Sequence, residues 1–251
     1  MTKPVVATGL MMLFEQGKFS LSDPLSHYLP EFANLQVMSA TVQENPQKDL
    51  STNITALKKP ITILDLLRHS AGFTLAAEKQ GPVEALYLNA ELDNCRSLAE
   101  FSASVAKLPL VFQPSEQWRY SVASDIQGRL IEVLSGKSLA VFLQDNIFAP
   151  LGMVDTHFTL PKNKYARLSE LYHYQATAPL TPYVGNDYIV PEQPPFYPSG
   201  GIGLVASTLD YWRFAQMLAN KGEFQGQRLL QPSTVKLMTQ NQLPLHINSI
   251  W

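Results

Sequence analysis

Apolar residues recur at every third or fourth position over residues 3–16, which is the spacing of one face of an α-helix. The positions that form this pattern are Val6, Leu10, Leu13 and Phe14. Gly17 follows directly and is well placed to end the helix. Pro4 has no backbone N–H and is tolerated only in the first turn of a helix. We therefore expect this helix to begin at or before Met1, so that the chain starts inside an element.

Start and stop signals predict further helices along the rest of the chain. Thr62-x-x-Asp65 and Ser97-x-x-Glu100 resemble N-terminal capping boxes. Together with proline at helix starts and glycine at helix ends, they predict helices over residues 63–68, 82–92, 98–107, 124–134, 139–148, 208–220 and 232–239, and a short helix between Pro24 and Pro30. Only residues 36–40 and 203–206 are apolar runs typical of strands, too few for a complete sheet of ordinary size. Residues 165–198 are expected to be mostly loop with a little strand.

The composition indicates a globular protein that acts on a small molecule. The chain has 251 residues, of which 45% are hydrophobic, so it can bury a sizeable core. Its 19 Lys and Arg residues nearly balance 21 Asp and Glu residues without runs of one sign, so we expect no nucleic-acid partner. Cys95 is the only cysteine, which excludes a disulfide framework and leaves cytoplasmic and periplasmic locations both open. No apolar run approaches the ~20 residues of a membrane span, so none is expected.

Three places in the sequence bear on catalysis by a serine with a lysine base. The pattern S-x-x-K puts the lysine on the same helix face as the hydroxyl that it activates. Ser104 with Lys107 lies at the end of a predicted helix, and Ser233 with Lys236 lies at the start of another, where serine is an ordinary first-turn residue. We expect neither pair to be catalytic. For Lys3, the matching serine would stand directly before Met1.

Short motifs, spread along the chain in a fixed order, resemble those of the β-lactamase-related serine hydrolases. That superfamily includes class C β-lactamases, D-alanyl-D-alanine peptidases and family VIII carboxylesterases. The motifs are Met1-Thr2-Lys3-Pro4 with Glu15-Gln16-Gly17-Lys18, Asp23-Pro24-Leu25 with Tyr28-Leu29-Pro30, Pro60-Ile61-Thr62-Ile63 with Leu66-Leu67-Arg68-His69-Ser70-Ala71-Gly72, Pro114 with Trp118-Arg119-Tyr120-Ser121, Phe148-x-Pro150-Leu151-Gly152-Met153, Gly200-Gly201-x-Gly203-Leu204, and Leu229-Leu230-x-Pro232. Each motif is weak alone, but their common order makes the resemblance strong.

The resemblance implies an acyl-enzyme mechanism. In this superfamily a helix-borne serine attacks a carbonyl, a lysine three residues later and a distant tyrosine manage its proton, and water then releases the acyl group. The matching positions are Lys3 and Tyr120. Free lysine and tyrosine side chains titrate at about pH 10 or above, so such a pair acts near neutral pH only if the groups influence each other or are buried. We therefore expect the two side chains to lie together.

The resemblance also indicates which residues bind the substrate. They are Trp118, Ser121, Val122, Gly200 and Gly201. Val122 stands where the stricter β-lactamases carry Asn, so the amide that would hold the side-chain carbonyl of a β-lactam is missing. This segment is more similar to the esterase branch. We therefore expect carboxylic esters in preference to β-lactams or D-amino-acid peptides.

By the same resemblance, residues 1–251 form a single α+β domain of the β-lactamase and D-alanyl-D-alanine peptidase type, a helical lobe beside an antiparallel sheet flanked by helices. We expect the chain to be mostly helix and loop, a fragment whose sheet domain is incomplete. It would lack the N-terminal strands with the nucleophilic serine and the late strands with His-x-Gly or Lys-Thr-Gly. Such a chain would be nearly inactive and could self-associate through exposed sheet edges. The alternative hypothesis is a natural short module that binds a partner or an acyl ligand without catalysis.

Neither a metal nor a cofactor is expected. The five histidines are scattered without His-x-x-x-His spacing. Gly201-Ile-Gly203-Leu-Val-Ala206 matches a dinucleotide-binding pattern, but no buried strand precedes it, and Glu223 in a loop is the one acidic residue near the required spacing. Arg68 and His69 are expected to hold loops together.

Overall fold

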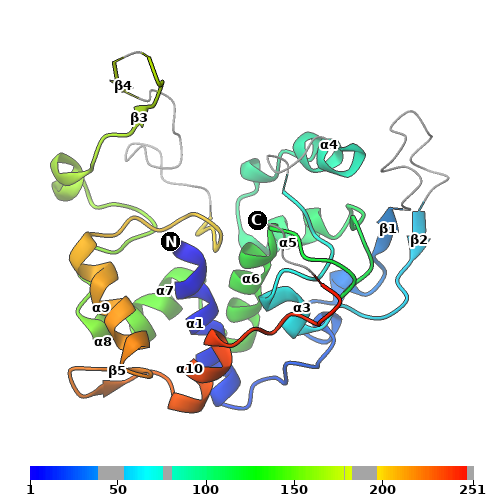
Figure 1. Cartoon of the computed structure of the whole chain (residues 1–251), viewed down its shortest axis with the longest axis horizontal. Helices are drawn as coiled ribbons and strands as arrows, with labels where there is room; N and C mark the ends of the chain where they lie inside the picture. The colour runs from blue at the N-terminus through cyan, green and yellow to red at the C-terminus, as the bar shows by residue number, and fades with distance from the viewer. Residues whose placement is uncertain (39–53, 76–80, 178, 183–196, 248–251) are drawn as a thin grey trace.

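The computed structural model describes residues 1–38, 54–75, 81–177, 179–182 and 197–247 (Figure 1). The helices are α1 (Thr2–Glu15), α3 (Ile63–Leu67), α4 (Pro82–Asn89), α5 (Leu98–Val105), α6 (Ala123–Ser135), α7 (Leu139–Leu143), α8 (Ala149–Leu151), α9 (Thr208–Ala219) and α10 (Pro232–Thr239). Short 3-10 turns are η1 (Leu25–His27), η2 (Pro30–Phe32), η4 (Leu92–Asn94) and η6 (Lys162–Arg167), and η5 (Gln144–Phe148) is a π-helical turn. The strands are β1 (Gln36–Met38), β2 (Ile54–Ala56), β3 (Tyr172–His173), β4 (Thr181–Pro182), β5 (Glu223–Phe224) and β6 (Gln227–Arg228).

Helix α1 lies at the centre of the molecule, where it packs against α6 and α7. Eight of its 14 residues are buried, so it is enclosed on more than one side. Gly9 lets α7 approach closely, because a Cβ there would lie 2.9 Å from Cδ2 of Leu143. Exposed Pro4 occupies the first turn, where its missing N–H leaves no helical hydrogen bond unmade. The central position of α1 fixes where its first residues meet the rest of the chain.

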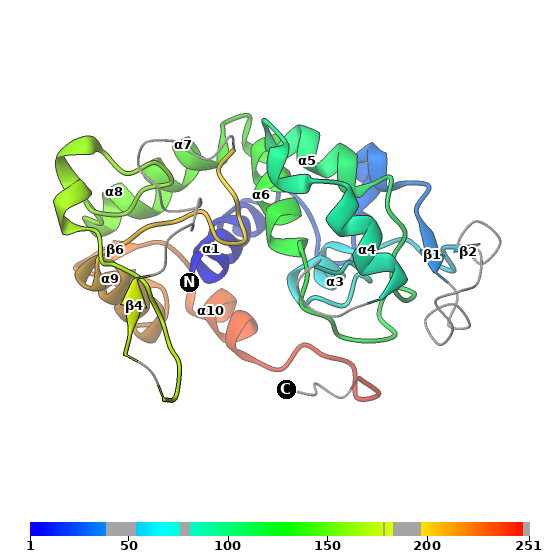
Figure 2. The ribbon, with the colours of Figure 1, turned by 90° about the horizontal axis from the view of Figure 1, so that it is seen from above.

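The remaining elements lie on two sides of α1 and α6 (Figures 1 and 2). On one side are α3, α4, α5 and the β1–β2 pair, and on the other are α8, α9 and the β3–β4 pair. The described strands form three antiparallel sheets of two strands each: β1 with β2, β3 with β4, and β5 with β6. The described part of the chain is therefore mainly helix and loop, as the sequence predicts.

Most predicted helices are present with boundaries within a few residues. The helix predicted over residues 3–16 is α1, and the prediction for residues 232–239 matches α10 at both ends. Gly136 ends α6 in the left-handed conformation, with φ of 70°. Thr62 makes both hydrogen bonds of a capping box with Asp65. Ser97 accepts from the N–H of Glu100, but the Glu100 carboxylate accepts from the N–H of Arg96, so the second box is incomplete.

Two predictions require correction. Residues 203–206 do not form a strand: Val205 makes only an isolated bridge with His157, because the segment turns sharply after Ser199, whose carbonyl accepts from Gly203. The single helix predicted over residues 139–148 is divided into α7 and η5, and α8 follows. Pro150 lies in α8 and has no backbone N–H to donate a regular helical hydrogen bond. Of the strand predicted at residues 36–40, residues 39 and 40 lie outside the described part.

Arg68 holds loops together, as predicted. Its guanidinium donates to Asp65, to the hydroxyls of Ser70 and Ser115, and to the carbonyl of Gln242. Asp65 is buried, and the pKa of its carboxyl is lowered because hydrogen bonds from Ser115, Thr62, Arg68 and Ser70 outweigh the effect of burial. This network ties α3 and the segment that follows it to two distant parts of the sequence, at Ser115 and Gln242.

Candidate active site

Lys3 and Tyr120, which lie far apart in the sequence, come together at the start of α1. Nζ of Lys3 lies 4.6 Å from the centroid of the Tyr120 ring, so the ammonium faces the aromatic ring. The same Nζ donates a hydrogen bond of 2.8 Å to the carbonyl oxygen of Gly201. Both side chains are partly exposed. Lys3 and Tyr120 therefore lie together as expected, and the ammonium group contacts the face of the tyrosine ring.

His69 occupies the other side of Tyr120. The two rings are stacked, with centroids 5.5 Å apart and an interplanar angle of 15°. Nδ1 of His69 lies 3.1 Å from the hydroxyl oxygen of Ser121, and the His69 carbonyl accepts from the N–H of Arg119. Burial, with a smaller effect from the charge of Lys3, lowers the pKa of His69 to about 4. The imidazole is therefore neutral at pH 7.

His69 was expected only to hold loops together. The structure shows that it also contacts Tyr120, a candidate catalytic residue. Its backbone explains how it reaches the site: His69 has φ of 59°, a left-handed conformation that turns the chain directly after α3. The only sequence signal was its place in the motif before Gly72. Type and spacing alone could not show which ring it would face.

Trp118 is the partly exposed member of the five predicted substrate-binding residues. Its ring is tilted by 54° to that of His69, with centroids 6.2 Å apart. Ser121 and Val122 are only 4% exposed, and Gly200 and Gly201 are buried. Their side of the site consequently forms its inner wall, while Trp118, Lys3 and Tyr120 reach the surface.

Asp125 was not predicted, although it organises this inner wall. The carboxylate is buried in the first turn of α6 and accepts from Oγ of Ser199 at 2.6 Å and from the N–H of Gly201 at 3.2 Å. Burial raises the pKa of this carboxyl, while the hydrogen bonds from Ser199 and Gly201 and the charge of Lys3 oppose that rise. A signal existed in the sequence: an acidic residue one helical turn after Ser121, ahead of the two adjacent glycines.

Gly200 has to be glycine at this position. A Cβ on Gly200 would lie 2.2 Å from the carbonyl oxygen of Ser124, a backbone atom that cannot easily move. A Cβ on Gly201 would lie 2.8 Å from Oδ2 of Asp125. The two glycines therefore let the turn pass close to α6, which brings the Gly201 carbonyl within reach of Lys3.

The two internal S-x-x-K matches have ordinary surroundings. Ser104 is partly buried in α5, and its hydroxyl oxygen accepts a long contact of 3.9 Å from the thiol of Cys95. Ser233 is exposed at the start of α10. The carbonyl of Ser104 accepts from the backbone N–H of Lys107 at 3.2 Å, and within the described residues no hydrogen bond joins the hydroxyl of either serine to the side chain of a lysine, a tyrosine or a histidine.

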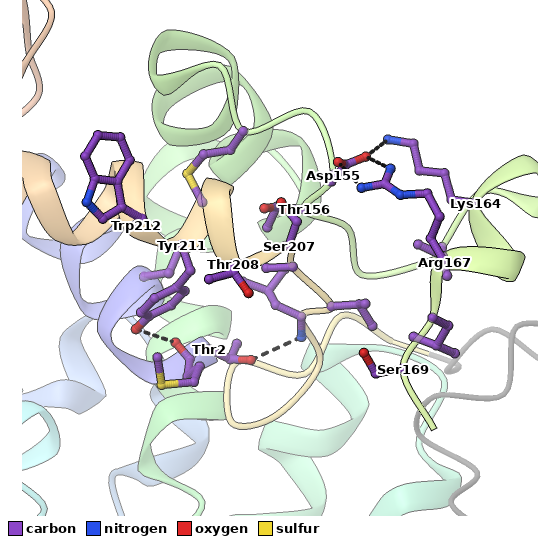
Figure 3. Close-up of a pocket in the computed structure, with 18 of the residues that line it drawn as sticks. Thr2, Asp155, Thr156, Lys164, Arg167, Ser169, Ser207, Thr208, Tyr211 and Trp212 are labelled. Atoms are coloured by element: carbon purple, nitrogen blue, oxygen red, sulfur yellow. Dashed lines mark hydrogen bonds and ion pairs between the residues drawn. The ribbon is translucent and has the colours of Figure 1, made fainter. Parts of the chain in front are cut away.

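A cavity of about 840 Å³ opens beside the first residues of α1 (Figure 3). Its wall includes Met1 and Thr2, residues 202–208 and the start of α9, and most of its lining is apolar. Two hydrogen bonds support this wall: Tyr211 donates to the carbonyl of Met1 at 3.2 Å, and the N–H of Leu204 donates to the hydroxyl of Thr2 at 3.1 Å.

Charged groups stand at one edge of the cavity. Asp155 forms ion pairs of 2.8 Å with both Lys164 and Arg167. The hydrogen bonds from Arg167 and Lys164 hold the pKa of the Asp155 carboxyl well below its usual value. Two cations thus share one carboxylate, so this edge has a positive excess.

Within the residues that the structure describes, none of the helices has both the length and the apolar character needed to span a bilayer. Over the same residues, no three His, Cys, Asp or Glu side chains gather as a possible metal site.

A partly buried lysine at the start of a central helix, set against a tyrosine ring from a distant segment, is the arrangement that the resemblance to the β-lactamase-related serine hydrolases leads us to expect. Comparison with known sequences agrees. The profile of the Beta-lactamase family matches residues 1–250, and the chain belongs to this family.

Three relatives illustrate this membership. The chain is 30% identical over 244 residues to Protein Rv1367c of Mycobacterium tuberculosis, with 97% of this chain and 58% of that protein covered. It is 30% identical over 250 residues to lovastatin esterase of Penicillium rubens, with 96% and 58% covered. The structure of simvastatin synthase from Aspergillus terreus superposes with a TM-score of 0.79 at 25% identity, with 98% and 58% covered.

The fold is that of the β-lactamases and DD-peptidases. The chain spans 58% of the length of each of these three proteins. The chain is therefore a member of the β-lactamase-related superfamily, and two of the relatives it resembles are named as esterases.

Proposed function

We propose that the full-length protein is a serine hydrolase that cleaves carboxylic esters through an acyl-enzyme. The observation that supports this most directly is the contact of 4.6 Å between the Lys3 ammonium and the Tyr120 ring at the start of α1. Three residues before Lys3 on the same helix face is the position directly preceding Met1, and the proposal places the nucleophilic serine there. This part of the helix is where a substrate carbonyl would meet both side chains.

The steps follow from this placement. The serine hydroxyl attacks the ester carbonyl and its proton passes to the Lys3–Tyr120 pair. When the tetrahedral intermediate collapses, the C–O bond to the alcohol breaks and the pair returns the proton to the leaving oxygen. A water molecule then attacks the acyl-serine, giving up one proton to the pair, and the carboxylic acid leaves as the serine recovers its proton.

Position 122 favours esters over β-lactams. Val122 is 4% exposed and its backbone N–H donates to the carbonyl of Thr74, so neither its side chain nor its N–H can hold a polar group of the substrate. An amide at this position would be needed to hold a β-lactam side chain. Two relatives named as esterases, from Penicillium rubens and Burkholderia gladioli, support the same choice.

The test is steady-state hydrolysis of p-nitrophenyl butyrate by a protein that includes the residues before Met1. Lys3→Met and Tyr120→Phe should each lower kcat by roughly a hundredfold or more, the usual contribution of positioned proton-transfer groups. Tyr28→Phe is the matched control, because Tyr28 donates to Asp23 at 2.7 Å on another part of the surface. Unchanged kcat in both site variants would contradict the proposal, and faster turnover of a chromogenic β-lactam would contradict the choice of ester.

A second candidate function is binding of an apolar acyl ligand without catalysis. The cavity beside Met1 favours it, because about 840 Å³ with a mainly apolar wall lies in the range of small-molecule sites. Calorimetric titration with decanoate tests it. Leu204→Trp should fill the cavity and abolish the heat of binding, whereas Leu88→Trp, at a residue 67% exposed on α4, should not. If decanoate gives no saturable heat, this second function is wrong.

Self-association through open strand edges is a separate proposal. It is motivated by β3 and β4, whose described residues are all exposed. Light scattering should show a molar mass that increases with concentration. A constant monomer mass would contradict it.

A further inference from the structure

Asp125 ends a chain of hydrogen bonds that leads to Lys3. Its carboxylate accepts from the hydroxyl of Ser199 and from the N–H of Gly201, and the Gly201 carbonyl accepts from Nζ of Lys3 at 2.8 Å. Ser199 also accepts from the N–H groups of Gly201 and Ile202. These hydrogen bonds hold the turn against α6 and fix the direction of the carbonyl that Lys3 meets.

The buried carboxylate also has an electrostatic role. Removing a carboxylate from water is unfavourable unless hydrogen bonds and an opposite charge compensate. At Asp125 two hydrogen bonds do so, and the charge of Lys3 is near enough to act on the carboxyl as well. The carboxylate and the ammonium are linked through one peptide group, because the Gly201 N–H donates to Asp125 and the Gly201 carbonyl accepts from Lys3.

The groups around Lys3 come from four separate places in the fold: three loop positions and α6. Tyr120 presents its ring, Gly201 presents its carbonyl, His69 feels the Lys3 charge through space, and Asp125 acts from α6. His69 is neutral at pH 7, so among these groups Asp125 alone can supply a full negative charge.

We propose that Asp125 is the positioning residue of Lys3: through the Ser199–Gly201 turn it fixes where Nζ points, and its negative charge acts on the ammonium group across the same turn. This inference rests on the proposed function for its catalytic meaning, since Lys3 is the proposed proton-transfer group. The test of this inference requires no ester turnover, so the inference and the proposed function can fail separately.

The experiment measures the reactivity of Lys3 in the 251-residue chain. A brief pulse of acetic anhydride at pH 8, followed by mass spectrometry, gives the acetylation rate of Lys3 relative to exposed Lys18 in the same molecule. Asp125→Asn removes the charge but keeps the size of the side chain. Because the variant loses the negative charge and weakens the turn whose carbonyl holds Nζ, we expect Lys3 to react about tenfold faster.

Two further variants separate charge from structure. Ser199→Ala removes one hydrogen bond to Asp125 but keeps the charge and the hydrogen bond from Gly201, so the Lys3 rate should rise less than in Asp125→Asn. Asp210→Asn removes another buried carboxylate, which accepts from the N–H of Asp155 and the hydroxyl of Thr156, and should leave Lys3 unchanged. An unchanged rate in Asp125→Asn, or an equal increase in Asp210→Asn, would overturn the proposal.

A reciprocal measurement remains decisive if Asp125→Asn does not fold. Lys3 is partly exposed, so Lys3→Met should fold, and carbon-13 NMR can follow the Asp125 carboxyl as the pH is lowered. Loss of the Lys3 charge should raise the pKa of the Asp125 carboxyl further, because that charge opposes the effect of burial. An Asp125 titration that is identical in wild type and Lys3→Met would show that the two groups are not coupled.

Discussion

Lowering the pH from 8 to 4.5 should destabilise this protein through His69. The folded state holds the imidazole neutral against Tyr120, with a pKa of about 4, whereas the ordinary value is 6.5. As the pH falls through 6.5, the unfolded chain takes up a proton on His69 before the folded protein does. The contribution of neutral His69 to stability is therefore complete above pH 6.5, declines between 6.5 and 4, and is lost below that range.

The size of the effect follows from the difference between the two pKa values. The linkage relation for values of 6.5 and about 4 gives a loss of about 2.5 kcal/mol between pH 8 and pH 4.5, as an order-of-magnitude figure. Other groups titrate over the same range. Asp125 contributes with the opposite sign, because its pKa is raised. The quantity to compare is therefore the free energy of unfolding as a function of pH, in wild type and in a variant without the imidazole.

Urea unfolding at several pH values between 8 and 4.5 measures this difference. His69→Asn should be less stable than wild type at pH 8, and its free energy of unfolding should fall less steeply with decreasing pH, so that the two curves converge near pH 4. His27→Asn is the matched control, because the side chain of His27 is exposed and should leave the pH dependence as it is in wild type. Parallel curves for wild type and His69→Asn would refute the inference that a neutral, buried imidazole supports Tyr120.

Two further predictions concern stability around the site. Gly200→Ala should lower the free energy of unfolding by about 1–3 kcal/mol in chemical denaturation, because its Cβ would lie 2.2 Å from the carbonyl oxygen of Ser124; wild-type stability would contradict the close approach. Arg119→Met should cost about 3 kcal/mol in the same assay, because it leaves Glu84, only 5% exposed, without the partner that lies 2.5 Å away. Lys137→Met breaks an exposed ion pair and should cost less than about 1 kcal/mol; equal losses in these two variants would contradict the role of burial.

The sequence predicts the helices well where local chemistry decides their ends. Pro232 at the first helical position and Gly136 in a left-handed cap act within a few residues of themselves, and α10 and α6 have the predicted form. Residues 139–148 show the limit of this reasoning. Apolar spacing predicts one helix there, but it cannot show how the chain accommodates Pro150, which it does through a π-helical turn.

The candidate site is less accessible to sequence reasoning, because it forms only when distant segments meet. Lys3 and Tyr120 were predicted together through the resemblance to a family. His69 stacks on Tyr120 from the segment after α3, and Asp125 on α6 holds the Gly201 turn that Lys3 meets. Nothing in the local sequence of either residue says which segment it would face. Their roles depend on burial and on neighbours more than 50 residues away in the sequence.

The central claim is that the start of α1 is the site of acyl-enzyme formation. Labelling the protein that includes the residues before Met1 with a fluorophosphonate, and locating the adduct by mass spectrometry, tests this claim most directly. We expect a single adduct, on a serine three residues before Lys3. This adduct should form more slowly in Lys3→Met. An adduct on Ser104 or Ser233, or steady ester turnover by the 251-residue chain itself, would contradict the claim.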